Sequence, residues 1–330
     1  MRIESPFKPY DVIIEADSLK KTVIEHRPLT LITDSGVPRS YIETMEQYHG
    51  IDLKLSVDEG EASKSLDTYA RLIESMQKDH FPREGSVIAL GGGMINDLAG
   101  FAAATYKRGV HLYLVPTTLT AMVDAAIGGK FAVNTALAKN SIGTFYTPEK
   151  VIADPFTLET LPRKNLAEGM AEVIKIALAR DASFFSQLEK KHPAFNNPEM
   201  LERAVYLKKE LVEKDPFDKK ERRLLNLGHT FAHALETMHG YTYTHGECVA
   251  EGLRIISNGT VYEERLYHLL SAYGLKQRIP WTADKLMQHI AHDKKTDRDH
   301  IDIPLVKKVG KGFIERFKTE DVKAFLRGDT

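Results

Sequence analysis

The chain has 330 residues, of which 42% are hydrophobic and 28% are charged, a composition typical of a globular protein with room for two hydrophobic cores. Its 45 basic residues nearly balance its 46 acidic residues, so net charge gives no reason to expect a nucleic-acid or membrane partner. A single cysteine, Cys248, excludes an intrachain disulfide framework. Without a secretory signal pattern or an apolar run of membrane-spanning length, we expect a cytoplasmic protein.

The first half of the chain alternates β-rich runs with helical patterns. Predicted strands lie at 29–33, 51–55, 86–90, 111–115 and 151–154. Such alternation indicates a parallel sheet of the α/β class. A run at 10–15 is expected to add an edge strand or a hairpin.

From about residue 156 the apolar periodicity becomes helical. Predicted helices lie at 166–178, 182–190, 200–214, 224–238 and 248–269, so the second half is expected to be nearly all α. The dipeptide Asp154-Pro155 marks the expected boundary. We therefore predict an α/β domain at 1–155 and a helical domain at 156–330.

A glycine turn follows the predicted strand at 86–90. Three consecutive glycines, at 91–93, precede a helix that begins with small residues. Such a turn lets backbone amides approach a pyrophosphate at the start of a helix, where the helix dipole favours negative charge. The spacing is not the usual dinucleotide-binding pattern, and glycines also serve tight turns. This motif alone leaves nucleotide binding open.

Polar residues follow the first two parallel strands at the sheet edge where open α/β sheets bind ligands. Asp34 could accept hydrogen bonds from a ribose, or equally cap a helix. Glu61 and Lys64 could contact the same ligand, or form a solvated surface pair.

The glycine-rich segment after the fourth parallel strand carries groups suited to an anion. Any one lysine is more often a surface charge, but the concentration of these groups in a poorly periodic segment favours a binding function. The groups are Thr117, Thr118, Asp124, Lys130, Lys139 and Asn140.

Three histidines indicate a metal site. His229 and His233 lie one helical turn apart, and His245 follows a loop that contains glycine. Imidazole is the commonest protein ligand for zinc-like ions, and a catalytic site typically takes three protein ligands. A carboxylate ligand is available in Glu172, which lies among apolar residues where an unpaired carboxylate is costly. An ion pair with Lys175, three residues later, is the alternative.

Seven motifs, taken in order, resemble those of the 3-dehydroquinate synthases, which are sugar phosphate cyclases. They are GGGMINDLAGF at 91–101, TYKRG at 105–109, VPTTL at 115–119, VDAAIGGK at 123–130, GMAEVIK at 169–175, LNLGHTFAH at 225–233 and HGE at 245–247. The resemblance spans most of the chain. It implies an amino-terminal Rossmann-like domain that binds NAD and a helical domain that binds a zinc or cobalt ion.

The resemblance also implies roles for particular residues. The metal ligands become Glu172, His229 and His245, with His233 as a polar substrate or relay neighbour, although helical spacing alone would make His229 and His233 both ligands. The NAD contacts become Asp34, Glu61, Lys64, Gly92, Gly93, Asp97, Thr117, Thr118, Lys130, Lys139 and Thr160. The substrate residues become Lys130, Asn140, Asn226 and Arg108 for phosphate, Lys208 and Arg222 for carboxylate, Lys175 and Asp124 for hydroxyls, and Lys295. Arg108 is expected to act across a homodimer interface.

The implied reaction converts 3-deoxy-D-arabino-heptulosonate 7-phosphate into 3-dehydroquinate and phosphate, with transient oxidation by NAD. Two alternatives stay open: another cyclase, such as an amino-dehydroquinate synthase, or a metal- and NAD-dependent polyol dehydrogenase that releases NADH. The sequence departs from the commonest family wording at Asn96, Phe131 and Pro216. Of these, Phe131 leaves the fine substrate preference open.

Overall fold

A computed structural model describes residues 1–293 and 300–327 of the chain. It contains two compact units. The first consists of Met1–Pro162 and Phe195–Phe217, and the second of Arg163–Ala194 and the chain from Asp218 onward. These units differ from the predicted single boundary after residue 155 in two respects: the chain leaves the first unit seven residues later, and a later segment returns to it.

The returning segment contains helix α7 (Pro198–Lys214), which packs against the short helix η3 (Ala121–Ala125) and strand β2 (Tyr10–Ile14). Val205 and Val212 of α7 belong to the first unit's hydrophobic core. Helical periodicity shows that a helix has an apolar face, but it does not show which core covers that face.

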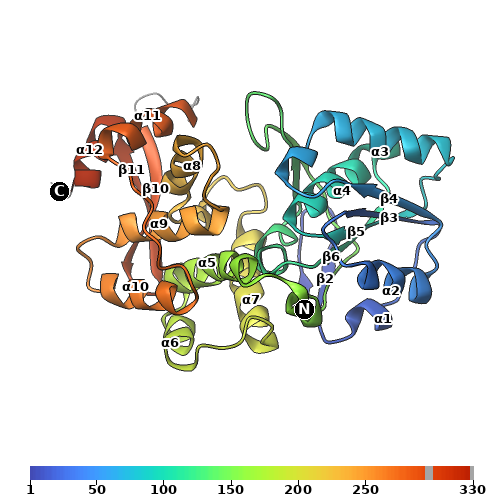
Figure 1. Ribbon diagram of the computed structural model, residues 1–330, viewed down its shortest axis with the longest axis horizontal. Helices are drawn as coiled ribbons and strands as arrows, with labels where there is room; N and C mark the ends of the chain where they lie inside the picture. Colours follow the sequence, from blue (N-terminus) through green and yellow to red (C-terminus); the bar gives the residue numbers. More distant parts are fainter. Residues whose placement is uncertain (294–299, 328–330) are drawn as a thin grey trace. The chain divides into compact units, whose positions relative to one another are not determined.

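The first unit is built on a seven-stranded sheet (Figure 1). Its strand order is β1 (Arg2–Ile3), β2, β9 (Lys150–Ala153), β6 (His111–Pro116), β5 (Ser86–Gly91), β3 (Leu29–Asp34) and β4 (Leu53–Val57). All neighbours are parallel except β1 and β2. Every predicted parallel strand is confirmed, with β4 beginning two residues late. The run at 10–15 forms both a hairpin with β1 and a parallel pair with β9.

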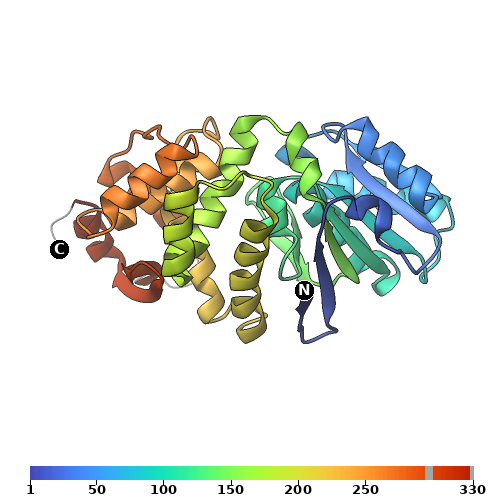
Figure 2. The ribbon, with the colours of Figure 1, turned by 90° about the horizontal axis from the view of Figure 1, so that it is seen from below.

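Helices cover both faces of this sheet (Figure 2). Val87 and Ala89 of β5 belong to one core with α3 (Leu66–Lys78) and α4 (Gly93–Thr105), whereas Ile88 and Leu90 belong to a second core with α1 (Ser18–Lys21) and α2 (Arg39–His49). A strand buried on both faces requires a continuous apolar run, which is the pattern that predicted it. The glycine-rich segment adds an unpredicted hairpin of β7 (Lys130–Val133) and β8 (Ile142–Phe145).

The second unit is mainly helical. It contains α5 (Arg163–Arg180), α6 (Ala182–Lys191), η5 (Glu221–Asn226), α8 (His229–Met238), α9 (His245–Ser257), α10 (Glu263–Ala272), α11 (Ala283–Asp293) and α12 (Thr319–Arg327). The predicted helix at 224–238 is interrupted at Gly228, where φ is 76°, and the one at 248–269 is two helices separated by a turn with Gly259 at φ 71°. Glycine adopts this left-handed conformation without a steric penalty.

An antiparallel hairpin of β10 (His300–Lys308) and β11 (Lys311–Lys318) also belongs to the second unit. The expectation of a nearly all-α second half overlooked it. Across residues 1–293 and 300–327, every helix is too short or too polar to cross a membrane.

Candidate active-site residues

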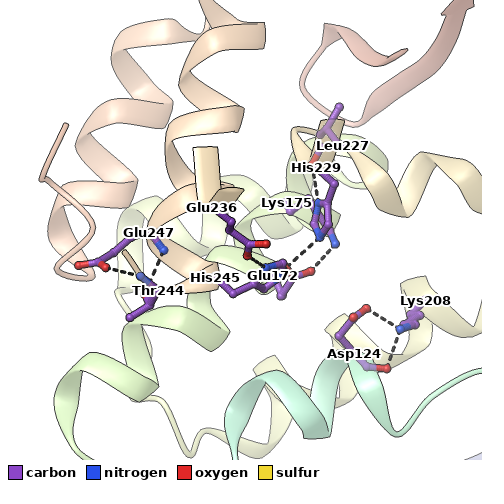
Figure 3. Close-up of polar contacts among 10 residues, drawn as sticks. All are labelled: Asp124, Glu172, Lys175, Lys208, Leu227, His229, Glu236, Thr244, His245 and Glu247. Carbon is purple, nitrogen blue, oxygen red and sulfur yellow. Dashed lines mark hydrogen bonds and ion pairs between the residues drawn. The ribbon is translucent and has the colours of Figure 1, made fainter. Parts of the chain in front are cut away.

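Three helices of the second unit bring Glu172, His229 and His245 together (Figure 3). Glu172 lies in the middle of α5, while each histidine is the first residue of its helix, α8 or α9. Glycine permits the close helix packing. A Cβ on Gly246 would lie 2.4 Å from the Cα of Glu168 in α5, and one on Gly252 would lie 2.2 Å from the carbonyl oxygen of Gly228.

The two imidazoles face one oxygen of Glu172. Nε2 of His229 lies 3.5 Å from Glu172 Oε1, and Nε2 of His245 lies 3.6 Å from the same atom. This oxygen is buried and has no hydrogen-bond partner. Leaving a buried carboxylate oxygen without a partner costs free energy. Its position between two imidazole nitrogens therefore suits the binding of a cation by all three groups. One carboxylate and two imidazoles form a donor set suited to zinc or cobalt.

His233 lies outside this converging group. It is exposed on α8, and its ring centroid is 5.5 Å from that of His229 and 6.3 Å from that of His245. The three residues whose ligand atoms lie within 4.8 Å of one another are Glu172, His229 and His245. Glu172 therefore takes the place that helical spacing gave to His233. Spacing along one helix therefore identified a neighbour of the group, because the third converging side chain comes from a different helix.

Neighbouring charges and burial shift the pKa values of all three residues in this cluster. Lys175 donates a hydrogen bond to Oε2 of Glu172. Burial opposes ionisation of Glu172, but Lys175 and the two histidines hold its pKa well below the ordinary value. Burial and the nearby Lys175 lower the pKa of His229 to about 3. Burial also lowers the pKa of His245, but the nearby carboxylates of Glu172 and Glu236 outweigh it and raise that pKa to about 10. A neutral His229 has a free lone pair for a ligand bond.

Glu236, which was not among the residues predicted from the sequence, contacts the other side of His245. Its Oε1 lies 2.7 Å from Nδ1 of His245, and the side chain is buried. A signal was present: the carboxylate directly follows two apolar residues, Ala234 and Leu235, inside a predicted helix. It also lies seven residues after His229, which places both residues on one face of α8.

In the first unit, a buried lysine forms a second polar cluster. Lys64 is only 4% exposed and donates hydrogen bonds to Asp97 of α4 and to Oδ1 of Asn140. Glu61 is exposed and lies 3.9 Å from the ammonium group. The alternative prediction, that Glu61 and Lys64 form a solvated surface pair, is therefore wrong for Lys64, which is buried. Burial raises the pKa of Asp97 to about 6, although Lys64 opposes the shift.

The glycine turn lies at the carboxyl end of β5. Gly92 precedes the first residue of α4, and the amide of Thr117 donates a 3.0 Å hydrogen bond to the carbonyl of Gly91. A Cβ on Gly92 would lie 3.2 Å from the methyl group of Thr118. Strand end, glycine turn and helix start therefore have the arrangement that suits a pyrophosphate.

Asp34 lies beside the same turn, at the end of β3. Its Oδ1 accepts a 2.8 Å hydrogen bond from the amide of Gly36, and its Oδ2 would lie 3.2 Å from a Cβ on Gly91. Burial raises the pKa of Asp34. The carboxylate thus stabilises its own turn, and a contact with ribose stays a prediction.

Asp124 and Lys208 form a second ion pair between a carboxylate and a lysine in the first unit. Asp124 lies in η3, and the buried ammonium of Lys208, from α7, contacts both its carboxylate and its backbone carbonyl, the latter at 2.6 Å (Figure 3). The family resemblance assigns Asp124 to substrate hydroxyls and Lys208 to the substrate carboxylate. Because the two side chains are in direct contact, the position of each depends on the other.

The remaining predicted residues are spread over several elements. Lys130, Lys139, Arg108, Asn226 and Thr160 are exposed, and Arg222 is buried in η5. The hydroxyl of Thr160 lies 3.0 Å from that of Tyr41. Lys295 lies outside the described residues.

Phe131, the departure that left substrate preference open, is 1% exposed. Its ring lies against α4, where a Cβ on Gly100 would approach it to 2.3 Å. The ring is therefore part of the first unit's core.

A second group of possible ligands, His26, His111 and Glu149, is a poorer metal site. The imidazole rings stack with centroids 3.4 Å apart and planes at 4°. A bound metal lies in the plane of each imidazole ligand, and stacked parallel planes do not meet at one ion. Glu149 already pairs with His111 and Lys8.

Known proteins match nearly the whole chain. The family described as 3-dehydroquinate synthase N-terminal matches residues 54–168, and the one described as 3-dehydroquinate synthase C-terminal matches 169–296. The 3-dehydroquinate synthase of Streptococcus mutans is 38% identical, with 99% of both chains covered. That of Enterococcus faecalis is also 38% identical, over 99% of this chain and 98% of the relative.

Solved structures agree with these matches. A 2-deoxy-scyllo-inosose synthase complexed with carbaglucose-6-phosphate, NAD+ and Co2+ has a TM-score of 0.88 at 26% identity, with 99% of both chains covered. The 2-epi-5-epi-valiolone synthase of Streptomyces hygroscopicus, with NAD+ and Zn2+ bound, has a TM-score of 0.86 at 26% identity, over 97% of this chain and 96% of that chain. A glycerol dehydrogenase of Schizosaccharomyces pombe, at 14% identity and TM-score 0.64, covers 96% of this chain and 88% of its own and shares the fold alone.

Proposed function

The chain belongs to the 3-dehydroquinate synthase family, and from this premise we propose that it converts 3-deoxy-D-arabino-heptulosonate 7-phosphate into 3-dehydroquinate and phosphate. It is a lyase that depends on NAD and a divalent metal. The observation that carries the site assignment is the buried, unpartnered Oε1 of Glu172 facing Nε2 of His229 and of His245.

Glu172, His229 and His245 would hold the zinc or cobalt ion, which supplies polarisation of a substrate hydroxyl for hydride transfer to NAD. His229 is neutral in this environment because burial and Lys175 lower its pKa. Lys175 fixes the other oxygen of Glu172, which leaves Oε1 directed at the histidines. We assign Lys175, which lies at this cluster, to orienting a substrate hydroxyl.

NAD would bind at the glycine turn of the first unit. The amides at Gly92 and Gly93 open α4, and a helix start favours a pyrophosphate. Lys64 holds Asp97 and Asn140 beside this helix, and Thr117 and Thr118 border the turn. The NAD+ in the solved cyclase structures supports this assignment.

The proposed anion contacts favour a substrate that carries a carboxylate as well as a phosphate. Lys208 and Arg222 are buried cations, and we assign them to the substrate carboxylate, with Lys130, Asn140, Asn226 and Arg108 for the phosphate. Desolvated cations bind anions more strongly than exposed ones do. A cyclase for a substrate without a carboxylate has no use for two such cations. Packing of Phe131 in the core also removes the main reason to expect an altered pocket.

Two further parts of the proposal concern assembly and location. Arg108 is exposed in a tight turn, where its φ is 65°, which suits a contact with a second copy of the chain. A homodimer in which Arg108 completes the partner's phosphate site is therefore part of the proposal, and light scattering tests the dimer. A cytoplasmic location remains a prediction from the sequence.

Product identification tests the proposed function. The purified protein is incubated with the heptulosonate phosphate, NAD and zinc or cobalt. We expect equimolar phosphate and 3-dehydroquinate, no accumulation of NADH, and loss of turnover on chelation. Steady NADH formation from a polyol would instead establish a dehydrogenase. Turnover of only the amino-substituted heptulosonate would establish an amino-dehydroquinate synthase.

A further inference from the structure

We infer that Glu236 is a positioning residue for the metal site: by accepting a hydrogen bond from Nδ1 of His245, it directs Nε2 of that histidine toward Glu172. This inference rests on the proposed metal site. The contact is 2.7 Å long, and Glu236 is 5% exposed.

The two histidines are anchored in the same way at their distal nitrogens. Nδ1 of His229 lies 3.2 Å from the carbonyl oxygen of Leu227, and Nδ1 of His245 contacts Glu236. In both cases Nε2 is the atom that faces Glu172. A hydrogen bond at one ring nitrogen fixes the tautomer, so the other nitrogen presents its lone pair to a metal.

His245 needs this anchor more than His229 does. The side chain of His245 is 39% exposed, compared with 12% for His229. Packing therefore restrains the ring of His245 less than that of His229. The buried carboxylate supplies the missing restraint.

Charge gives Glu236 a second effect on the site. The carbonyl that anchors His229 is neutral, whereas the group that anchors His245 is a carboxylate. Lys175 offsets the charge of Glu172, so the two carboxylates and one ammonium carry one net negative charge. A carboxylate partner also makes an imidazole a stronger donor to a metal. Both effects favour a dication.

Helix α8 ties the two anchored histidines together. His229 begins this helix and Glu236 lies seven residues later on the same face. One rigid element therefore supplies a ligand directly and orients the other ligand, which belongs to α9. Contact between α8 and α9 maintains this arrangement.

Metal affinity of two variants separates a positioning role from a merely structural one. Glu236→Leu removes both the acceptor and the charge, whereas Glu236→Gln keeps an acceptor. Competition with a chromogenic chelator should show about 10- to 100-fold weaker Co2+ binding for Glu236→Leu and a smaller loss for Glu236→Gln. The visible absorption of bound Co2+ should also change in Glu236→Leu, because the orientation of a ligand changes.

Glu247 provides a matched control. It lies two residues after His245, and its carboxylate caps α9 through the amide of Thr244 at 2.8 Å. Glu247→Gln should lower the melting temperature without changing the affinity for Co2+ or its spectrum. Glu236→Leu and wild type with affinities within twofold and identical spectra would overturn the inference. If Glu236→Leu does not fold, equal affinities of Glu236→Gln and Glu247→Gln would overturn it.

Failure of the proposed metal site has a different signature. In that case wild type itself would not bind one Co2+ per chain, or His245→Ala would bind it as tightly as wild type. Wild-type binding that His245→Ala abolishes, combined with no effect at Glu236, would reject only the positioning role.

Discussion

Two carboxylates in this protein, the partly buried Asp97 and the buried Glu172, each contact a lysine, and the difference between them separates a closed polar cluster from an open one. Lys64 sits among Asp97 and the amide oxygen of Asn140, all within the first unit. Lys175 satisfies only one oxygen of Glu172, and the other faces two imidazole nitrogens without a hydrogen bond. A buried carboxylate oxygen that faces two imidazole nitrogens is placed to share a cation with them.

The largest effect is expected at the open cluster. His245→Ala should remove tightly bound metal and lower turnover by more than about a thousandfold, because two ligands do not hold a catalytic ion in place. Metal analysis after gel filtration and the phosphate-release assay measure both effects. His233→Ala, the matched control from the adjacent imidazole, should retain one metal per chain. Equal metal loss in both variants would contradict the distinction between them.

At the closed cluster, the lysine itself should matter for stability. Lys64→Met leaves Asp97 without its cation and should lower the free energy of unfolding by about 4 kcal/mol, as breaking a buried ion pair does. Urea denaturation measures it. The control is Lys54→Met, which removes an exposed lysine paired with Glu46 and should cost less than about 1 kcal/mol. Similar losses for the two variants would show that burial of Lys64 has no energetic consequence.

The pH dependence of stability should reveal the burial of Asp97. Its pKa rises from 3.8 to about 6 on folding, so the folded state holds the proton at pH values where the unfolded state has lost it. Between about pH 4 and 6, folding stability should therefore fall as pH rises. The total is about 3 kcal/mol for a shift of about two pKa units.

Asp97→Asn provides the reference for this titration, because other carboxylates also change charge in the same range. Denaturation midpoints at pH 4.5, 5.5 and 7 should give wild type a steeper decline than the variant. Parallel curves would mean that Asp97 titrates normally in the folded protein.

The smallest effect concerns the packing of α4, the helix that carries Asp97. Gly100→Ala would place a methyl group 2.3 Å from the ring of Phe131, and overpacking should cost about 2 kcal/mol, partly offset by the better helix propensity of alanine. Replacing Phe131 by Leu should relieve part of this cost. A double-mutant cycle measures the coupling, and additive free energies would contradict the contact.

The sequence predicted those features that arise from local patterns. Strand β5 is a continuous apolar run because both of its faces are buried. Its residue types alone therefore predict the strand. The turn at 91–93 was likewise predictable from its residue types, because three consecutive glycines follow the strand. By contrast, α7 has an apolar face that fits either unit's core, so its return to the first unit was not predictable.

Site residues that depend on distant partners were harder to predict. Histidine content pointed to the metal cluster, but only family resemblance selected Glu172 over His233, because α5 and α8 meet only in the folded chain. Burial of Lys64 depends on a partner in α4 and another beyond β7. The strand β10 was missed although apolar side chains alternate at Ile301, Ile303 and Leu305, a period that a search for helices does not detect.

The most direct test of the open cluster is crystallographic. Diffraction from zinc-loaded crystals, measured on both sides of the zinc absorption edge, locates the ion without reference to activity. We expect one strong anomalous peak per chain, within about 2.2 Å of Glu172 Oε1 and of Nε2 of both His229 and His245. A strong peak elsewhere, or one ligated by His233 in place of Glu172, would contradict the account.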